Sequence, residues 1–460
     1  MVFSVPGINH ILGELLDIQT VVSVLVKELT LLKQEVVELR KENQLLRERL
    51  SRYEHSKDSH NSHLPPSKDP VGKKKGFNLR EKSGRKSGGQ PGHPGHYLEM
   101  QTPDKIEILS PNYCRCCGGD LRNISGEEVE RRQQIDIPPI RPIVTEYRRI
   151  RKICTCSHAN TVDFPATVTA PVCYGPNIQA LVTYTNICQH IPYKRQVEMF
   201  REVFGVSLSE GLIKNILSRM ERRLTPAYET IRNELMHSPV VGVDETGTSV
   251  NGQTRWAWVW QNNQLTYVTG GHSRKKEVFS SVMPEGMPQT ILVSDCYSSY
   301  FSVNVKNHQI CTAHILRELI FLSELYDKHP WTEQMAELIR EAIHLKKTAC
   351  EKIDDTGIQQ RFQTLLSQSI DQTYKKILTL QKRLIKYKDY LFLFLKNEWV
   401  PPDNNASERA IRVFKVKLKV SGFFKSNEGE QRFALLHSIA NTARKNNCSP
   451  FFVFQLATNC

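Results

Sequence analysis

The sequence predicts a multidomain protein of the α+β class. Three observations lead to this prediction: a heptad repeat at the N-terminus, two close groups of cysteines, and buried-strand patterns that alternate with helical periodicity in the second half. The chain has 460 residues, enough for roughly three domains at about 150 residues each. With 39% apolar residues and 24 glycines, the composition is close to the globular average and excludes disorder of the whole chain.

The chain is basic, with 62 Lys and Arg against 48 Asp and Glu, a net charge of +14. This predicts a polyanionic partner, either nucleic acid or an anionic membrane surface. No apolar run is long enough to span a bilayer, and Glu14 and Asp17 interrupt the N-terminus before the first lysine, Lys27, unlike a signal peptide. We therefore expect a cytoplasmic protein in which clustered cysteines, among 12 in total, bind metal.

Residues 1–53 carry apolar residues at positions a and d of a heptad repeat. The a series is Ile8, Leu15, Val22, Leu29, Val36, Asn43 and Leu50, and the d series is Ile11, Ile18, Leu25, Leu32, Leu39 and Leu46. The g and e′ positions that face each other in a parallel dimer have opposite charges: Glu28 with Lys33, Glu35 with Arg40, and Glu42 with Arg47. This predicts a leucine-zipper coiled coil and a homodimer formed through residues 8–53. The alternative is an amphipathic helix packed on the chain's own globular part.

Two segments follow the heptads. Residues 54–105 are rich in Pro, Gly, Ser and Lys, which predicts a basic flexible linker that either tracks phosphates or is a solvated tether. In residues 106–172, Cys114, Cys117, Cys154 and Cys156 are the candidate ligands of a tetrahedral Zn²⁺. Cys116 or His158 can replace a ligand, and the alternative is a set of free buried thiols. Between the two groups, residues 140–153 have strand character.

Residues 173–235 predict several helices. Gly205 allows a tight turn and Ser209 caps the helix that follows. A helix-turn-helix at this point would bring Lys214, Asn215 and Arg219 to DNA. The alternative is an ordinary pair of helices covering the next domain.

Acidic residues follow two buried strands in the predicted core, residues 236–325. One strand ends at Asp244, and another, residues 289–294, is followed by Asp295. A carboxylate in such a position is costly unless a cation or hydrogen-bond donors meet it. A third strand through residues 308–311 leads into a helix. Residues 326–400 then predict an α-helical insertion.

The last segment, residues 401–460, begins with two prolines that stop one helix, and the next helix carries Glu408. Two local explanations account for Glu408, a capping box with Asn405 and a helical ion pair with Arg412. Neither explanation requires a catalytic role.

Taken together, these motifs resemble bacterial DDE transposases of the insertion-sequence 66 type along nearly the whole chain. The matching stretches are Gly88–His93, the cysteine module opening at Cys114, Val243–Thr246, Ser294–Tyr300, Cys311–His314 and Asp403–Arg412. The second cysteine pair is C-x-C, a departure that leaves the zinc ligands open. The resemblance implies a ribonuclease-H-like α/β core in which Asp244, Asp295 and Glu408 form the catalytic, metal-binding triad.

Such a triad requires divalent cations, Mg²⁺ or Mn²⁺, because three carboxylates drawn together repel one another. Two ions about 4 Å apart would stabilise the attacking and leaving oxygens of an in-line displacement. Water would free a 3′-hydroxyl at the element end, and that hydroxyl would then attack target DNA. The resemblance also implies accessory proteins encoded by the same element. The rival function is a non-catalytic, dimeric, zinc-containing DNA-binding regulator.

Basic residues beside the third acid are the candidate phosphate contacts. They are Arg409, Arg412, Lys415 and Lys417, to which the helical segment adds Lys214 and Arg219. A solvated helix face is the simpler explanation for the lysines. For Cys311 and His314 we expect a structural role where a strand meets a helix, and for Glu245 a side chain on the face of its strand opposite Asp244.

Overall fold

The computed structural model describes residues 6–54, 90, 92, 94, 98–349 and 353–459. The chain divides into two units, one formed by residues 1–76, 149–196 and 209–460 and the other by residues 77–148 and 197–208. Most of the predicted basic linker, including most of the Gly88–His93 motif, lies outside the described residues, as do two of the cysteines, Cys350 and Cys460. No described helix contains an apolar stretch of the length needed to cross a bilayer.

The heptad segment forms one long helix, α1 (Pro6–Glu54). In α1 the structure describes the side chains of residues 21–43, 45–47 and 50, and the d-position leucines among them are more than half exposed, for example Leu32 at 59%. The a-position residue Val36 is 44% exposed. An apolar stripe of this kind is unfavourable in water unless another helix covers it.

The cysteine segment has very little regular structure. Strand β1 (Lys152–Ile153) pairs antiparallel with β2 (Ala159–Asn160), and Tyr113 forms an isolated bridge with Asp120. The prediction of a strand over residues 140–153 is therefore wrong except at its end. In the described structure no second strand pairs with residues 140–151, and a single strand without a partner or a core is not stable.

Three helices follow: α2 (Pro176–Ile187), α3 (Tyr193–Phe204) and α4 (Glu210–Met236). The predicted cap is confirmed, because the Ser209 hydroxyl accepts a hydrogen bond from the Leu212 backbone N–H at 3.2 Å. Gly205 has the positive φ of 64° that the turn requires. The apolar side of α4 is buried, and the Tyr228 hydroxyl donates to the Val268 carbonyl at 2.7 Å. Helix α4 therefore packs on the chain's central sheet.

Five strands form a mixed sheet in the order β5-β4-β3-β6-β7. They are β3 (Val240–Val250), β4 (Gln253–Gln261), β5 (Thr266–Gly271), β6 (Met287–Ser294) and β7 (Val305–Ile310). The first three are antiparallel to one another, whereas β6 runs parallel to β3 and β7 parallel to β6. The α+β prediction is thus confirmed, and so are the strands before Asp295 and Cys311.

Strand β3 is longer than predicted. The buried apolar pattern stops at Asp244, but the backbone remains paired with β4 as far as Val250, opposite Gln253. The hairpin then closes at Asn251 and Gly252, which both have positive φ. Asp244 therefore lies within a strand and not at its end.

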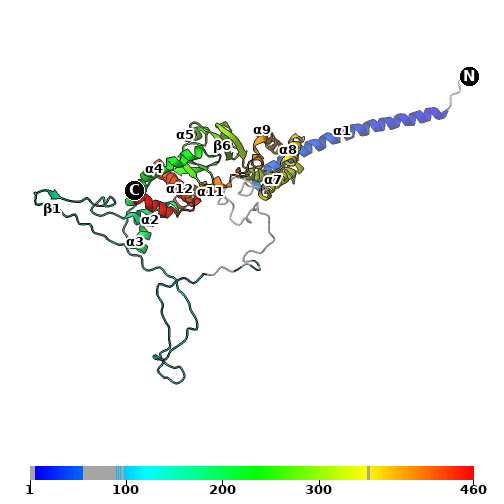
Figure 1. Ribbon diagram of the computed structural model, residues 1–460. Helices are drawn as coiled ribbons and strands as arrows, with labels where there is room; N and C mark the ends of the chain where they lie inside the picture. Colours follow the sequence, from blue (N-terminus) through cyan, green and yellow to red (C-terminus); the bar gives the residue numbers. More distant parts are fainter. Residues whose placement is uncertain are drawn as a thin grey trace. The chain divides into compact units, whose positions relative to one another are not determined.

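Helices cover both faces of the sheet (Figure 1). On one face lie α11 (Asn405–Ser421) and α12 (Asn427–Lys445), where the Ser438 hydroxyl accepts from the Val268 backbone N–H at 2.8 Å. On the other face the ring of Trp260 packs edge-on against Phe279 of α5 (Lys276–Val282) at 5.5 Å. The last helix, α13 (Pro450–Asn459), contacts α2.

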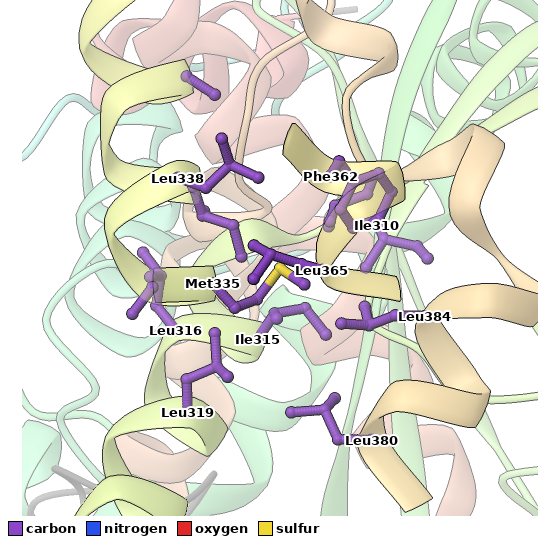
Figure 2. Close-up of a cluster of buried hydrophobic side chains, with 14 of the residues drawn as sticks. Ile310, Ile315, Leu316, Leu319, Met335, Leu338, Phe362, Leu365, Leu380 and Leu384 are labelled. Carbon is purple, nitrogen blue, oxygen red and sulfur yellow. The ribbon is translucent and has the colours of Figure 1, made fainter. Parts of the chain in front are cut away.

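Helix α6 (Thr312–Leu325) follows β7, and the predicted insertion after it is helical. A 3₁₀ turn, Tyr300–Ser302 (η2), precedes β7. The insertion contains α7 (Pro330–Thr348), α8 (Thr356–Ser367), α9 (Lys375–Lys386) and α10 (Leu393–Lys396), with another 3₁₀ turn at Lys388–Tyr390 (η3) within it. These helices have their own core, in which Met335 of α7 is surrounded by side chains of α6, α8 and α9 (Figure 2). The Gln309 side chain ties this core to β7 through the Leu391 carbonyl at 2.9 Å and the Phe394 N–H at 2.9 Å.

Candidate active site

The first two acids of the predicted triad lie on neighbouring parallel strands. Gly242 of β3 is paired with Val293 of β6. Asp244 and Asp295 each follow their paired residue by two positions, so both side chains lie at the same level of the sheet. Asp295 directly follows the last residue of β6, as predicted.

The third acid, Glu408, is brought to this point by the start of α11. The Asn404 side-chain amide donates to the Val243 carbonyl at 2.6 Å, and its Oδ1 accepts from the Ser407 hydroxyl at 2.6 Å. Gly242 makes this close approach possible, because a Cβ at that position would lie 2.7 Å from Asn404 Oδ1. Asn404 and Ser407 lie within the Asp403–Arg412 motif, but neither they nor Gly242 had an expected role, since their roles exist only once the helix meets the strand.

The three carboxylates influence one another electrostatically. Burial raises the pKa of Asp244 well above its ordinary value, and the negative charges of Glu245, Asp295 and Glu408 raise it further. A divalent cation would remove this cost by supplying positive charge to oxygen ligands. The residues present therefore fit the metal that such an acidic site requires.

Glu408 is held by two basic side chains of α6. Its Oε1 lies 3.1 Å from His314 Nε2 and 3.5 Å from Arg317 Nη1. Burial alone would raise the pKa of Glu408, but the hydrogen bond and charge of His314, with the charge of Arg317, lower it to about 2. Both local explanations of Glu408 are thereby corrected. Asn405 is the first residue of α11 and not its cap, and the described ion pairs of Glu408 join it to α6.

Cys311 and His314 lie where β7 passes into α6, as expected from the sequence. The Cys311 thiol is buried and accepts a hydrogen bond from the Asn404 backbone N–H at 3.1 Å. Burial would lower the pKa of His314, but its hydrogen bonds with Cys311 and Glu408 raise it well above the ordinary value. No local pattern indicated that this pair touches the third acid, because the contact spans about a hundred residues.

Glu245 and Arg274 form a second charged group beside the acids. Strand β3 continues through Glu245, so this side chain leaves the strand on the face opposite Asp244, in agreement with the prediction. Glu245 accepts hydrogen bonds from Arg274 and from the Tyr300 hydroxyl. Arg274 also lies 3.8 Å from Asp295 Oδ2 and stacks over the Tyr297 ring at 4.3 Å. Sequence reasoning missed Arg274, which lies in a loop without a recognisable motif.

The predicted DNA-contacting residues differ in exposure. Arg409 and Arg412 are exposed on α11, and Lys214 is exposed on α4. Lys415 is half-buried and donates to the Gly247 carbonyl at 2.7 Å, and Arg219 is half-buried and donates to Gln179 at 3.5 Å.

Lys417 is different, and here the prediction needs correction. Its side chain is buried, its Nζ lies 5.7 Å from the centre of the Phe433 ring, and burial lowers its pKa to about 8. Position 417 faces α12 because it follows the buried Phe414 by three residues on the same side of α11. Lys417 is therefore removed from the candidate DNA contacts.

The two cysteine pairs have similar local structures. The Cys114 N–H donates to the Gly119 carbonyl at 2.8 Å, and the Cys154 N–H donates to the His158 carbonyl at 2.8 Å. Hydrogen bonds from the backbone of Cys117 and Cys116 lower the pKa of Cys114. A hydrogen bond from the Cys156 backbone and one with the Thr155 side chain lower the pKa of Cys154 to about 7. Thiols that ionise this readily fit a zinc ion. The described cysteines form no disulfide.

Comparisons with known proteins match both the core and the cysteine segment. The model of the Transposase IS66 family matches residues 171–432, more than half of the chain. The zinc-finger binding domain of transposase IS66 matches residues 111–157, which include both cysteine pairs, and a family of unknown function matches residues 18–99. The uncharacterized protein y4hP of Sinorhizobium fredii (strain NBRC 101917 / NGR234) is 23% identical over 399 residues, covering 76% of this chain and 71% of that protein.

Proposed function

This chain belongs to the IS66 transposase family, and from that premise we propose that Asp244, Asp295 and Glu408 are its catalytic triad. The proposed reaction is cleavage of DNA at element ends, followed by strand transfer to target DNA. One observation carries the proposal: charges from three distant parts of the chain meet at Asp244 and raise its pKa. A non-catalytic DNA-binding regulator has no use for three mutually repelling carboxylates.

We propose that the sheet and its helices are a ribonuclease-H-like core. The support comes from the strand order β5-β4-β3-β6-β7, with antiparallel strands on one side of β3 and parallel strands on the other. The acids at β3 and β6 then lie side by side at the centre of the sheet. A helical insertion between the second and third acids is consistent with the same assignment.

In the proposed reaction, basic residues of the chain hold the DNA and keep the catalytic carboxylates in place. Mg²⁺ or Mn²⁺, held by Asp244, Asp295 and Glu408, would supply the positive charge that stabilises the attacking and leaving oxygens. Arg274 restrains Asp295 from one side, and His314 with Arg317 restrains Glu408 from the other. Arg409 and Arg412, exposed on α11 next to Glu408, are suited to hold phosphates.

The zinc ion of the cysteine module is proposed to bind Cys114, Cys117, Cys154 and Cys156, with Cys116 and His158 as substitutes. The match of residues 111–157 to a zinc-finger domain and the lowered pKa of Cys114 and Cys154 support this ligand set. Zinc at four thiolates would be structural, because such sites leave no position open for a substrate.

We further propose that α1 forms a parallel two-stranded coiled coil. The support is the exposed a and d stripe of α1, together with three oppositely charged g–e′ pairs. Dimerisation would bring two copies of the basic segments to the two ends of one element. Sedimentation of the full chain and of a variant with Leu32 and Leu39 changed to Lys tests this, and equal masses would contradict it.

The decisive test of the function is Asp295→Asn. This variant should bind duplexes carrying the ends of the encoding element as tightly as the wild type, while Mg²⁺-dependent cleavage falls at least 1,000-fold, on the order of 4 kcal/mol. Asp389→Asn, an exposed acid in the insertion, is the matched control and should cleave normally. Cleavage retained by Asp295→Asn would refute the triad and favour the regulator.

A further inference from the structure

We propose that Cys311, His314 and Glu408 form a second metal site, selective for Zn²⁺ over Mg²⁺, which withdraws Glu408 from the acidic site when it is filled. The site itself follows from geometry. The inhibition that it would cause rests on the proposed function, because it requires Glu408 to be a catalytic acid.

The donor atoms are already grouped. One ligand atom from each of the three residues lies within 4.8 Å of the other two, and His314 Nε2 is 3.1 Å from Glu408 Oε1. Zinc bonds of about 2.0–2.3 Å put neighbouring tetrahedral ligands about 3.5 Å apart. The three side chains therefore need to close by only about 1 Å around an ion.

The two elements that carry these residues are fixed to each other. Besides the Asn404 hydrogen bond to the Cys311 thiol, the Thr312 backbone N–H and hydroxyl both donate to the Pro402 carbonyl, at 3.0 Å and 2.8 Å. The start of α6 and the segment leading into α11 thus form one junction. Ligands on such rigid elements lose little entropy when they bind a metal.

The chemistry of the donors decides which metal fits. A thiolate, an imidazole and a carboxylate form a zinc set that leaves a fourth position for water, whereas Mg²⁺ prefers oxygen ligands alone. Cys311 is fully buried, but the side chains of His314 and Glu408 are 11% and 21% exposed, so an ion enters from their side. Arg317, 3.5 Å from Glu408, competes for the carboxylate and must turn outward.

Because Glu408 would belong to both metal sites, filling the second site would affect the acidic site. A carboxylate oxygen bound to Zn²⁺ beside Cys311 is not available to a metal held by Asp244 and Asp295. Rising Zn²⁺ would therefore inhibit Mg²⁺-dependent cleavage by competition for one side chain. Zinc held by the cysteine module would not take part in this competition, since its proposed ligands are separate residues.

Cobalt binding tests the site without relying on activity, because thiolate-bound Co²⁺ absorbs strongly in the near ultraviolet. The full chain is titrated with Co²⁺ as wild type, Cys311→Ser, His314→Gln and, as control, Cys448→Ser, a half-buried cysteine away from the acids. We expect the two site variants to lose the same part of the absorption, equivalent to one ion per chain, and Cys448→Ser to retain it. Equal absorption in all four proteins, or loss with Cys311→Ser alone, would overturn the site.

Inhibition is measured separately on the same proteins. The cleavage rate of each protein is expressed relative to its own rate without Zn²⁺. The Zn²⁺ concentration that halves this Mg²⁺-dependent rate should be about tenfold higher for His314→Gln than for the wild type, and an unchanged concentration would overturn the inhibition. The Asp295→Asn variant distinguishes failure of the proposed triad from failure of the proposed metal site. It should retain the cobalt absorption even though it cannot cleave, so a failed triad leaves the metal site standing, and a failed metal site leaves the triad standing.

Discussion

The acidic site and the cysteine pairs reach their geometry by different routes. Asp244 lies on β3, Asp295 directly follows β6 and Glu408 lies on α11. Buried hydrogen bonds of Asn404 and Ser407 hold the start of α11 against β3. The cysteine pairs lie in exposed turns held by a few local backbone hydrogen bonds. In the first region the packed fold brings the acids together, whereas in the second a bound metal would be needed to stabilise the folded structure.

Removal of zinc should therefore separate the two regions, and this is the largest effect that we expect. Structural zinc contributes on the order of 10 kcal/mol to the folding of small zinc modules. After treatment of the full chain with a zinc chelator, hydrogen exchange should become fast across residues 111–157 and remain slow across β3 and β6. Equal loss of protection in both regions would break the comparison, as would no loss at all.

Acidification should weaken the acidic region through His437, a buried residue of α12. Its Nε2 lies 3.1 Å from the Ala410 carbonyl of α11, and burial, with nearby Arg444 and His190, lowers its pKa to about 4. The unfolded chain has the ordinary value near 6.5, so between these values only the unfolded state binds the proton. Stability is thus complete above about pH 6.5 and falls by about 3 kcal/mol as the pH drops toward 4.

Urea unfolding at pH 7.5 and pH 5 checks this contribution. The stability lost between these two pH values should be smaller in His437→Gln than in the wild type, because Gln can keep the hydrogen bond without titrating. His344→Gln, an exposed residue of α7, should lose as much as the wild type. The same loss in all three proteins would exclude His437 as the source.

A methyl group at Gly242 should damage the acidic site selectively. In Gly242→Ala the Cβ would meet Asn404 and Ser407, shift α11, and cost about 2 kcal/mol of stability. Displacement of Glu408 by about 1 Å should lower cleavage about 100-fold. The matched control is Gly247→Ala on the same strand, where the nearest atom, Lys415 Nζ, is 3.8 Å away. If both variants cleave equally well, the close approach of α11 to β3 does not position Glu408.

The smallest effect concerns DNA binding next to the acids. Arg409→Gln and Arg412→Gln should each weaken binding a few-fold and reduce the slope of log affinity against log salt by about 1, since each arginine would neutralise one phosphate. Fluorescence anisotropy with a labelled duplex over a range of salt concentrations measures both quantities. Lys347→Gln, exposed on α7, is the control. Unchanged slopes for the arginine variants would move the phosphate contacts elsewhere.

The sequence predicted the parts of the fold that local patterns encode. Asp295 was recognised because β6 is a short apolar run that ends at it, and the helices of the insertion follow from their periodicity. The end of β3 was misjudged because its pairing with β4 continues after the apolar pattern has stopped at Asp244. Strand pairing of this kind depends on the partner strand and not on local sequence.

The site was predictable only in part, for a related reason. The local sequence around Glu408 fitted a capping box and an ion pair equally well, and only the resemblance to a family singled it out. Arg274 contacts Asp295, 21 residues later in the sequence, and Asn404 contacts Val243, about 160 residues earlier. No spacing rule predicts either contact. Lys417 was misplaced because helical periodicity alone does not show which side of α11 packs on α12.

The order of the elements along the chain also determines when the three acids can come together during synthesis. The helical insertion lies between Asp295 and Glu408, so the ribosome completes α1, the cysteine segment and all five strands of the sheet before α11 exists. Under the proposed triad, a nascent or truncated chain that ends within the insertion has the parts suited to dimerisation and DNA binding but lacks the third acid. If α1 dimerises as proposed, such a fragment would pair with a full-length chain and yield an inactive dimer, so incomplete synthesis would lower the activity of the whole population.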